Sequence, residues 1–367
     1  MIIPRRPGGL VAMLWVVAMV AGGCASRPLN PFTIETPPLI LAPASVTDVH
    51  DGRGRFREIF CTVTEARGRD LPDYRPCDEA LVALSGEHAA SGRAVALGES
   101  HANLRVVVVP GVGWDCLARF VGVTRTGRRH VEGLGYRTGA IAVEGLSGST
   151  RNAVQVRDAV LAFHRDNEAE RLVMIGYSKG VNDILEAIVT YPEIRPHIAA
   201  VVSHAGAVGG SPLATDTPES LLGMLRFAPG AECEPGDGQA LKSLRPDVRQ
   251  RWLAENPLPD SIRYYSLVTF PEPDNISSVL TSSYNKLSRV DARNDSQVIF
   301  YDQVIPGSVI LAYMNADHWA VALPLDRNHR VLGSTFVNRN AYPREVLLES
   351  VLRYVEEDLA DEQMPGR

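Results

Sequence analysis

The residues best suited to chemistry in this 367-residue chain form the pentapeptide Gly176-Tyr177-Ser178-Lys179-Gly180. An apolar run at 172–175 precedes it and is typical of a strand buried on both faces of a parallel sheet. Apolar residues after it recur on one stripe of a helix over 181–188. A serine at such a strand-to-helix turn needs glycine neighbours because the backbone crowds it. The pattern therefore predicts a nucleophilic serine lifted off the edge of the sheet.

A G-x-S-x-G pattern also occurs by chance, so an ordinary glycine-flanked turn is the alternative interpretation. A serine nucleophile further requires a base, an acid and backbone amides that bind the oxyanion. Where the nucleophile stands at such a turn, the acid and then the base follow it along the chain. The residues after Ser178 must therefore supply both groups.

His318 is the histidine best placed to be the base. It lies in the stretch 315–319, directly after the last expected strand at 308–314. A base in this position comes after both the serine and the acid, as the order of this architecture demands. The alternative is His204 at the end of the expected strand 198–203, which is the wrong strand for that order.

Two positions compete for the acid. Asp295 lies in a loop that leads into the last strand, 23 residues before His318. Glu272 and Asp274 come just after the expected strand 262–270. A buried carboxylate would accept a hydrogen bond from the imidazole and favour the imidazolium. Asp295 is preferred, and Glu272 and Asp274 are the alternatives. The other aspartates of this region are expected to be solvated or to cap turns: Asp291, Asp302 and Asp317.

The amides of the oxyanion hole are expected on two loops. The expected strand 104–109 is almost wholly β-branched and ends in Pro110-Gly111-Val112-Gly113. Glycines at a strand end allow the backbone to turn its amides towards a ligand. The Val112 amide would form one half of the hole and the Lys179 amide the other, with a plain turn as the alternative. The Lys179 side chain is expected to be exposed, where it would favour acidic substrates or simply be solvated.

Alternating strand and helix patterns predict an α/β fold with a mostly parallel central sheet flanked by helices. Strands are expected over residues 57–65, 93–97, 104–109, 139–143, 172–175, 198–203, 262–270 and 308–314. Helices are expected over residues 78–84, 149–164, 181–188 and 343–359. The stretch 51–103 would supply N-terminal strands and a short helix, 104–360 the catalytic core, and 361–367 a tail.

About fifty residues separate two expected strands at 208–260, which is long for a bare loop. The stretch is rich in glycine, proline and polar residues, with helix candidates at 219–227 and 239–255. It fits a helical cap over the active site. The apolar side chains of 219–227 would either line an acyl pocket or pack onto the body of the protein.

The N-terminal residues 1–23 have the features of a targeting segment. Two arginines are followed by an apolar run too short to span a bilayer and by a small-residue cleavage site. Cys24 follows directly, so the segment resembles a bacterial lipoprotein signal, and an ordinary secretory signal is the alternative. Acyl chains on Cys24 would anchor the protein in the cell envelope. The residue after the cysteine is Ala25 and not an aspartate, which resembles lipoproteins exported to the outer membrane. Prolines across 24–50 predict an extended tether.

The charge and the cysteine content limit the kinds of partner and cofactor that the protein is expected to bind. The net charge of −6 falls to −8 once Arg5 and Arg6 are cleaved off with the signal. The sequence has no basic patch that would indicate nucleic-acid binding. An acidic surface also disfavours electrostatic binding to a membrane, so the lipid anchor alone would hold the protein there. The four other cysteines are expected to form disulfides in an oxidising compartment. The expected pairs are Cys61 with Cys77 and Cys116 with Cys233. No metal site or cofactor is expected, because neither the cysteines nor the histidines have zinc-ligand spacing.

Residues 104–360 resemble the α/β-hydrolase fold, and among its members the bacterial triacylglycerol lipases and esterases. The similarity rests on Ser178 in GYSKG, Asp295 in NDSQV and His318 in NADHW. In such lipases the acid lies in an N-D-G loop about this far before the histidine, which favours Asp295. Two features depart from the lipases. Pro110-Gly111 stands in place of their His-Gly, and Ala320 in place of an aspartate that some of them use for calcium.

The resemblance implies a membrane-anchored serine hydrolase that cleaves carboxylic esters, lipid-like ones among them, through an acyl-enzyme. One alternative is an envelope protein that keeps the fold as a binding or assembly module. Another is an acyltransferase that uses the same three residues but passes the acyl group to an alcohol instead of water. Hydrolysis and transfer share the acyl-enzyme, so the residues do not separate them.

Overall fold

The computed structural model describes residues 49–84, 86–116, 125–227, 231, 233–328, 335 and 337–362. The expected signal at 1–23, Cys24 and the tether lie outside the described residues. Across the described ranges, no helix combines the length and the apolarity that crossing a bilayer would require.

A mostly parallel sheet is the framework of the fold. The described residues form eight strands: seven lie in the order β1-β8-β7-β6-β5-β3-β4, and the eighth, β2, pairs antiparallel with β8. The strands are β1 His50–Asp51, β2 Leu81–Val82, β3 Leu104–Val109, β4 Arg137–Ala140, β5 Arg171–Tyr177, β6 Ile198–His204, β7 Arg263–Thr269 and β8 Val309–Met314. Tyr177 pairs with His204, and Gly176 pairs with Val109, so β3, β5 and β6 end at the same edge. This edge carries the candidate site.

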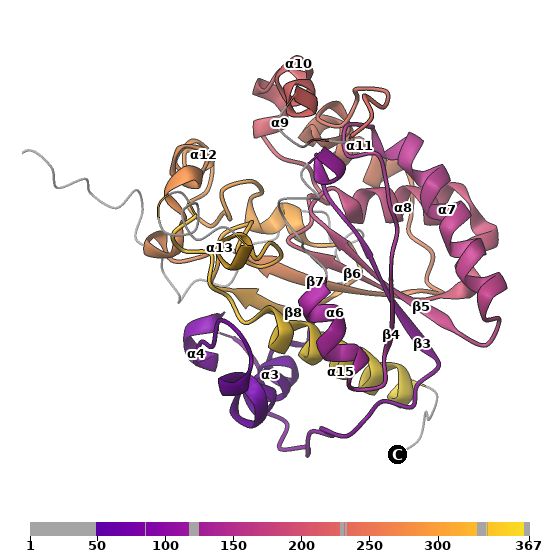
Figure 1. Cartoon of the computed structure of the whole chain (residues 1–367), viewed down its shortest axis with the longest axis vertical. Helices are drawn as coiled ribbons and strands as arrows, with labels where there is room; N and C mark the ends of the chain where they lie inside the picture. The colour runs from indigo at the N-terminus through magenta and orange to yellow at the C-terminus, as the bar shows by residue number, and fades with distance from the viewer. Residues whose placement is uncertain are drawn as a thin grey trace, which may run out of the picture. The chain divides into compact units, whose positions relative to one another are not determined.

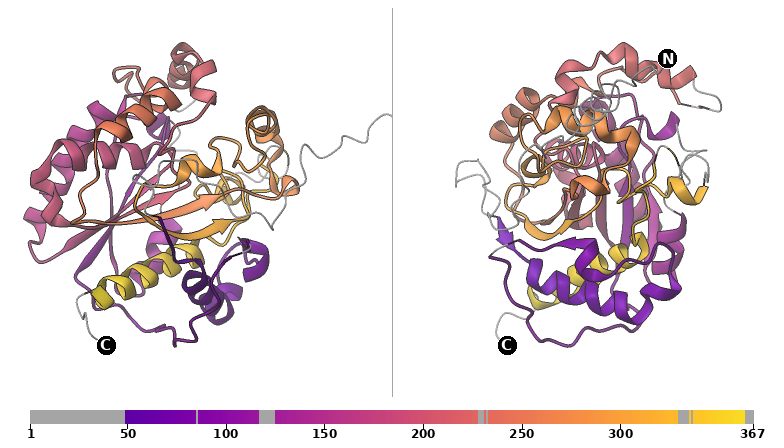
Figure 2. Two further views of the ribbon diagram at one scale, coloured as in Figure 1. Left: turned by 180° about the vertical axis from the view of Figure 1, so that it is seen from behind. Right: turned by 90° about the vertical axis from the view of Figure 1, so that its left-hand side faces the viewer.

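Helices cover both faces of the sheet. The helices are α3 Arg53–Arg67, α4 Cys77–Ala80, α6 Arg125–Glu132, α7 Ser149–Asp166, α8 Gly180–Thr190, α9 Leu213–Asp216, α10 Glu219–Gly223, α11 Pro246–Glu255, α12 Thr281–Leu287, α13 Leu325–Asn328 and α15 Arg344–Glu362. The indigo α3 and yellow α15 lie on one side of the sheet, and the magenta α7 and α8 on the other (Figures 1 and 2).

Strand β5 shows why two separate cores form. Its side chains alternate, as the period of a strand requires. Val173 and Ile175 belong to the apolar core shared with α3 and α15, whereas Leu172 and Met174 belong to the core shared with α7 and α8. Both faces of the strand are therefore buried, which explains its continuous apolar sequence.

The N-terminal part differs from the prediction. Residues 57–65 were expected to be a strand but lie within helix α3, where Phe56, Ile59, Phe60 and Val63 are buried at helical spacing. Their β-branched and aromatic side chains favour a strand locally, but a helix forms because it packs against α15. Residues 93–97 form no strand, and the expected helix 78–84 is the short α4 followed by β2.

Both expected disulfides are present. Cys61 of α3 is joined to Cys77 of α4, and Cys116, after β3, is joined to Cys233 in the inserted stretch 208–260. That stretch contains α9, α10 and α11, which gather at the top of the view in Figure 1. Within it, Ala214 and Leu244 pack with Val298 and Val112, so the stretch supports the acid loop and the loop after β3.

Candidate active site

Ser178 stands at a sharp turn between β5 and α8. Its backbone has φ 54°, a conformation that side chains other than glycine rarely adopt. A Cβ atom at Gly176 would collide with the backbone of Val181, and one at Gly180 would collide with the carbonyl oxygen of Val109. Both glycines of the pentapeptide are thus required by close backbone contact, as the sequence pattern predicted.

A chain of hydrogen bonds joins the three expected side chains. His318 Nε2 lies 3.0 Å from Ser178 Oγ, and His318 Nδ1 lies 2.7 Å from Asp295 Oδ2. The side chains of His318 and Asp295 are buried. A carboxylate at Nδ1 holds the ring proton there, which leaves Nε2 free to accept the serine proton. Serine, imidazole and carboxylate therefore have the geometry of a nucleophile, a base and an orienting acid.

The Asp295 loop is built around its carboxylate. Oδ1 accepts hydrogen bonds from the amides of Gln297 and Val298, at 2.9 and 2.7 Å. Ser296 adopts φ 82°, which lets the loop fold back on the carboxylate. The His318 amide donates to the Asp295 carbonyl oxygen over 2.9 Å. The acid and the base are consequently joined through backbone as well as through side chains.

Gln303 anchors this loop to the sheet and is a residue that the sequence reasoning missed. Its side-chain amide forms two hydrogen bonds with the backbone of Thr269 at the end of β7: Nε2 donates to the carbonyl over 2.8 Å, and Oε1 accepts from the amide at 2.7 Å. Nε2 also lies 3.4 Å from Asp295 Oδ2. Gln303 is fully buried. No sequence pattern marks it, because its burial and its contact with Asp295 are visible only in the structure.

The alternative acids lie elsewhere. Glu272 and Asp274 are exposed, and among the described residues it is Asp295 that provides the carboxylate in contact with His318. Asp317 caps the turn after it, as expected, by accepting from the amides of Trp319 and Ala320. The expectation that Asp302 is solvated or capping is wrong, because Asp302 is buried and burial raises its pKa to about 7. Asp291 bonds Arg293.

His204, the alternative base, does not contact Ser178 through its side chain. Its ring lies edge-on to Tyr177, with 6.0 Å between the ring centroids. Its buried Nε2 atom has no hydrogen-bond partner among the residues that the structure describes. Burial, with smaller contributions from the charges of His318 and Arg344, lowers the pKa of His204 to about 4. The imidazole is therefore neutral at physiological pH, and its own carbonyl oxygen accepts from the Ser178 amide.

The loop after β3 approaches the nucleophile closely. A Cβ atom at Gly111 would lie 2.8 Å from Ser178 Cβ and 3.3 Å from Ser178 Oγ. The Gly113 amide donates to the carbonyl of Gly145 over 2.9 Å, which fixes the turn. Val112 follows Gly111 directly, so its backbone belongs to the loop that contacts Ser178.

The expectation for the Lys179 side chain is wrong. Its ammonium is buried and lies 2.6 Å from Asp183 Oδ1, one helical turn along α8. Asn152 of α7 donates to the other oxygen of the same carboxylate over 2.8 Å. Burial in this polar cluster turns the lysine beneath the helix and away from the site. The expected role of Lys179 therefore concerns its backbone amide and not its side chain.

One group of potential metal ligands occurs in the described part of the chain: Asp115, Cys116 and Cys233. Its two sulfur atoms are joined in a disulfide, so they are not thiolate ligands.

The position of each group on the sheet defines the class. The serine follows β5, the carboxylate lies beyond β7, and the histidine follows β8 in a parallel sheet ordered β4-β3-β5-β6-β7-β8. This arrangement is that of an α/β-hydrolase. Neither a protein-family model nor a curated protein matches the chain.

Solved structures identify the family. The crystal structure of the metagenomic carboxyl esterase MGS0156 matches with a TM-score of 0.81 and 40% sequence identity, covering 93% of this chain and 99% of that one. The chain belongs to this carboxyl esterase family of α/β-hydrolases. The mature lipase BlEst2 of Bacillus licheniformis matches with a TM-score of 0.49 and 18% identity, covering 62% of this chain and 89% of its own.

Proposed function

We propose that the protein hydrolyses carboxylic esters with Ser178 as nucleophile, His318 as base and Asp295 as the acid that orients the histidine. The observation that carries the proposal is the chain of contacts at 3.0 and 2.7 Å from the serine oxygen through the imidazole to the buried carboxylate. The 40% identity with a carboxyl esterase supports the same reaction class.

In the first half of the reaction, Ser178 Oγ attacks the carbonyl carbon of the ester and passes its proton to His318 Nε2. The negative charge that develops on the substrate oxygen accepts hydrogen bonds from the amides of Val112 and Lys179. Removing one such donor costs about 10²–10³ in turnover, so these backbone segments matter almost as much as the side chains. The imidazolium is stabilised by the Asp295 carboxylate.

The acyl-enzyme then forms as the C–O bond to the alcohol breaks and His318 returns its proton to the leaving oxygen. In the second half, His318 takes a proton from water, the hydroxide oxygen attacks the acyl carbon, and the released serine regains its proton. The products are the alcohol and the carboxylic acid. The imidazole returns to the neutral form in which it began.

The proposal includes the place of action. Residues 1–23 would be removed as a lipoprotein signal and Cys24 would be acylated, which would hold the enzyme at the cell envelope, with Ala25 favouring the outer membrane. Expression of the full chain in a bacterium with an alkyne fatty acid tests this part. Labelling that is lost in Cys24→Ser supports the anchor, and an unlabelled mature protein that is found free in the soluble fraction rejects it.

A fluorophosphonate probe tests the catalytic part. Purified residues 25–367 are treated with the probe, weighed intact and assayed with p-nitrophenyl esters, with Ser178→Ala as the control. One adduct per chain, absent from Ser178→Ala, together with ester turnover, is the expected result. Folded protein that neither reacts with the probe nor cleaves any ester would reject the proposal.

A further inference from the structure

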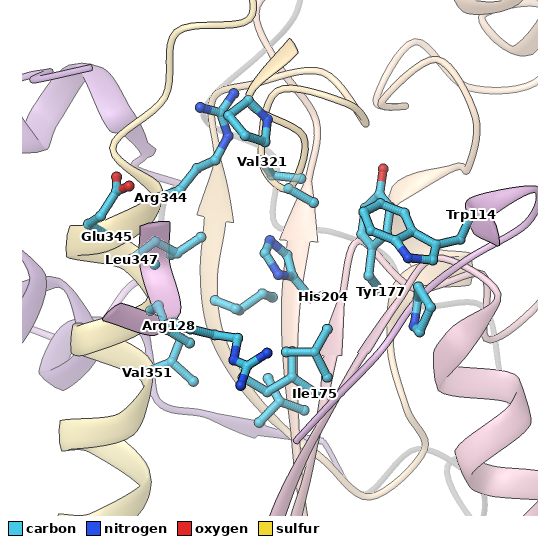
Figure 3. A pocket seen from close by; sticks show the side chains of 18 of the residues that line it. Trp114, Arg128, Ile175, Tyr177, His204, Val321, Arg344, Glu345, Leu347 and Val351 are labelled. Carbon is cyan, nitrogen blue, oxygen red and sulfur yellow. The ribbon is translucent and has the colours of Figure 1, made fainter. Parts of the chain in front are cut away.

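A cavity of about 100 Å³ lies beside the candidate active site, between the sheet and helix α15. Figure 3 shows Tyr177 and Trp114 on one side of it and Leu347 and Val351 of α15 on the other, with His204 between them. The expected lining by residues 219–227 of the inserted stretch is not part of this cavity. No part of the ester hydrolysis described above makes use of this space.

The walls of the cavity are mainly apolar. Four adjacent strands contribute an aliphatic side chain each: Val108, Ile175, Val202 and Leu267. The charged groups that line it have partners, since Arg344 bonds Asp73 at 2.9 Å and Arg327 bonds Glu345 at 2.7 Å. Arg128 donates to the Thr138 hydroxyl over 2.8 Å and lies 3.8 Å from the Glu132 carboxylate. Their charges are thus compensated by the protein itself. A hydrocarbon is the guest that these surroundings favour.

The cavity is lined by Tyr177, the chain neighbour of Ser178, and by residues of the loop after β3. Tyr177 precedes Ser178, and its ring lies 5.2 Å from that of His318 on one side and 6.0 Å from that of His204 on the other. Pro110 and Trp114 flank the loop that carries Val112. Gly111, next to Pro110, approaches Ser178 so closely that an added Cβ would lie 2.8 Å from Ser178 Cβ. The apolar space therefore begins at the chain neighbours of the serine that would carry the acyl group.

We propose that this cavity receives the acyl chain of the ester, an inference that rests on the proposed ester hydrolysis. A cavity of about 150 Å³ lined by apolar side chains holds one benzene molecule, so about 100 Å³ holds roughly four carbon atoms. The preferred acyl groups are accordingly short and linear, from butanoyl to hexanoyl. Each methylene buried here raises kcat/KM about four-fold, and the gain ends when the cavity is full.

The test compares p-nitrophenyl acetate, hexanoate and octanoate on the folded protein. Wild type is expected to prefer hexanoate over acetate by at least ten-fold in kcat/KM and to gain nothing with octanoate. Val351→Met extends a side chain into the cavity and should lower the hexanoate-to-acetate ratio at least four-fold. Val355→Met makes the same change one turn further along α15, at a buried position outside the cavity, and should leave the ratio unchanged.

Leu347→Ala makes the opposite change by lengthening the cavity and should raise the octanoate-to-hexanoate ratio at least four-fold. This second variant decides the matter if Val351→Met does not fold. Ratios that stay within two-fold of wild type in the folded variants would overturn the acyl-chain assignment. The fluorophosphonate adduct on Ser178 separates the two proposals, because it forms whether or not the cavity binds the chain.

Discussion

Tyr177 and His318 are joined at two points: the tyrosine hydroxyl donates to the carbonyl oxygen of the histidine over 2.8 Å, and their rings lie 5.2 Å apart. Tyr177 is the second residue of the glycine–serine pentapeptide, so the segment that carries Ser178 is also bonded to the loop that carries His318. Burial, with smaller contributions from the charges of Asp295 and Asp317, raises the pKa of Tyr177 well above its ordinary value. The phenol therefore stays protonated and able to donate throughout the working pH range.

Tyr177→Phe tests this coupling. The variant loses the hydrogen bond but keeps the ring, so kcat is expected to fall three- to ten-fold and the free energy of unfolding by about 1 kcal/mol. Tyr265→Phe is the matched control, because it loses a similar bond to Asp358 at 2.7 Å, far from the site. It should lower stability in urea titrations without lowering kcat. Equal kcat values for the two variants would contradict the positioning role.

Gly111→Ala tests the close approach of the loop after β3. The added Cβ would lie 2.8 Å from Ser178 Cβ, closer than such atoms come in proteins, so either the serine or the loop must shift. We expect kcat to fall about 100-fold, the effect of losing one oxyanion donor, in a protein that still folds. Gly98→Ala is the control, because no heavy atom lies within 4 Å of its added Cβ. Wild-type turnover in Gly111→Ala would mean that this loop does not border the oxyanion.

The parts that could be predicted from the sequence are those with local causes. The turn at Ser178 restricts the size of its immediate neighbours, so Gly176 and Gly180 predict it from the sequence. The buried strands are continuous apolar runs, and strand β3 has the predicted bounds 104–109. The position of His318 follows from chain order alone. Asp295 required the resemblance to the lipases, because several carboxylates fit the chain order equally well.

The parts that could not be predicted depend on contacts between distant residues. Helix α3 has the residue types of a strand and becomes a helix because α15, almost 300 residues later, covers its apolar stripe. Lys179 follows the nucleophile and reads as a solvated residue, but Asn152 of α7 completes a buried cluster around its partner Asp183. Gln303 has no pattern around it. It anchors the Asp295 loop by bonding the backbone of Thr269, which lies 34 residues earlier in the chain.

Gln303→Glu tests whether the glutamine side chain positions the acid. The variant replaces a donor 3.4 Å from Asp295 Oδ2 with a second negative charge. A second negative charge favours the imidazolium over the neutral imidazole, so the acidic limb of the kcat/KM profile should move to higher pH. We also expect kcat to fall about ten-fold. Gln303→Met separates the two effects, because it loses the anchor without adding charge and should lower kcat without moving that limb.

Lys179→Met tests the buried pair beneath the nucleophile. Removing the ammonium leaves the buried Asp183 carboxylate without its cation, which costs about 3–5 kcal/mol of unfolding free energy. The double variant Lys179→Met/Asp183→Asn removes both charges and should recover at least half of that loss in urea titrations. Because the lysine does not reach the site, the folded double variant should discriminate between anionic and neutral esters as wild type does. A changed preference would place the lysine charge at the substrate.

Asp302 should make stability depend on pH. Its pKa is raised to about 7 in the folded protein by burial, against about 4 in an unfolded chain. The folded state therefore binds the proton more tightly, and the stabilisation is present below pH 4 and lost as pH rises to 7. Asp302→Asn removes this titration. It should stabilise the protein by about 2–4 kcal/mol at pH 8, but have little effect at pH 4, since each pKa unit is worth about 1.4 kcal/mol.

Urea unfolding of wild type and Asp302→Asn at pH 4, 6 and 8 measures this difference. The exposed Asp70→Asn serves as the control for loss of a charge, and its unfolding free energy should follow that of wild type at every pH. Asp302 lies one residue before Gln303. Removing its buried charge would therefore also stabilise the segment that anchors the Asp295 loop. A constant difference between Asp302→Asn and wild type from pH 4 to 8 would show that Asp302 stays in one protonation state, whatever its burial.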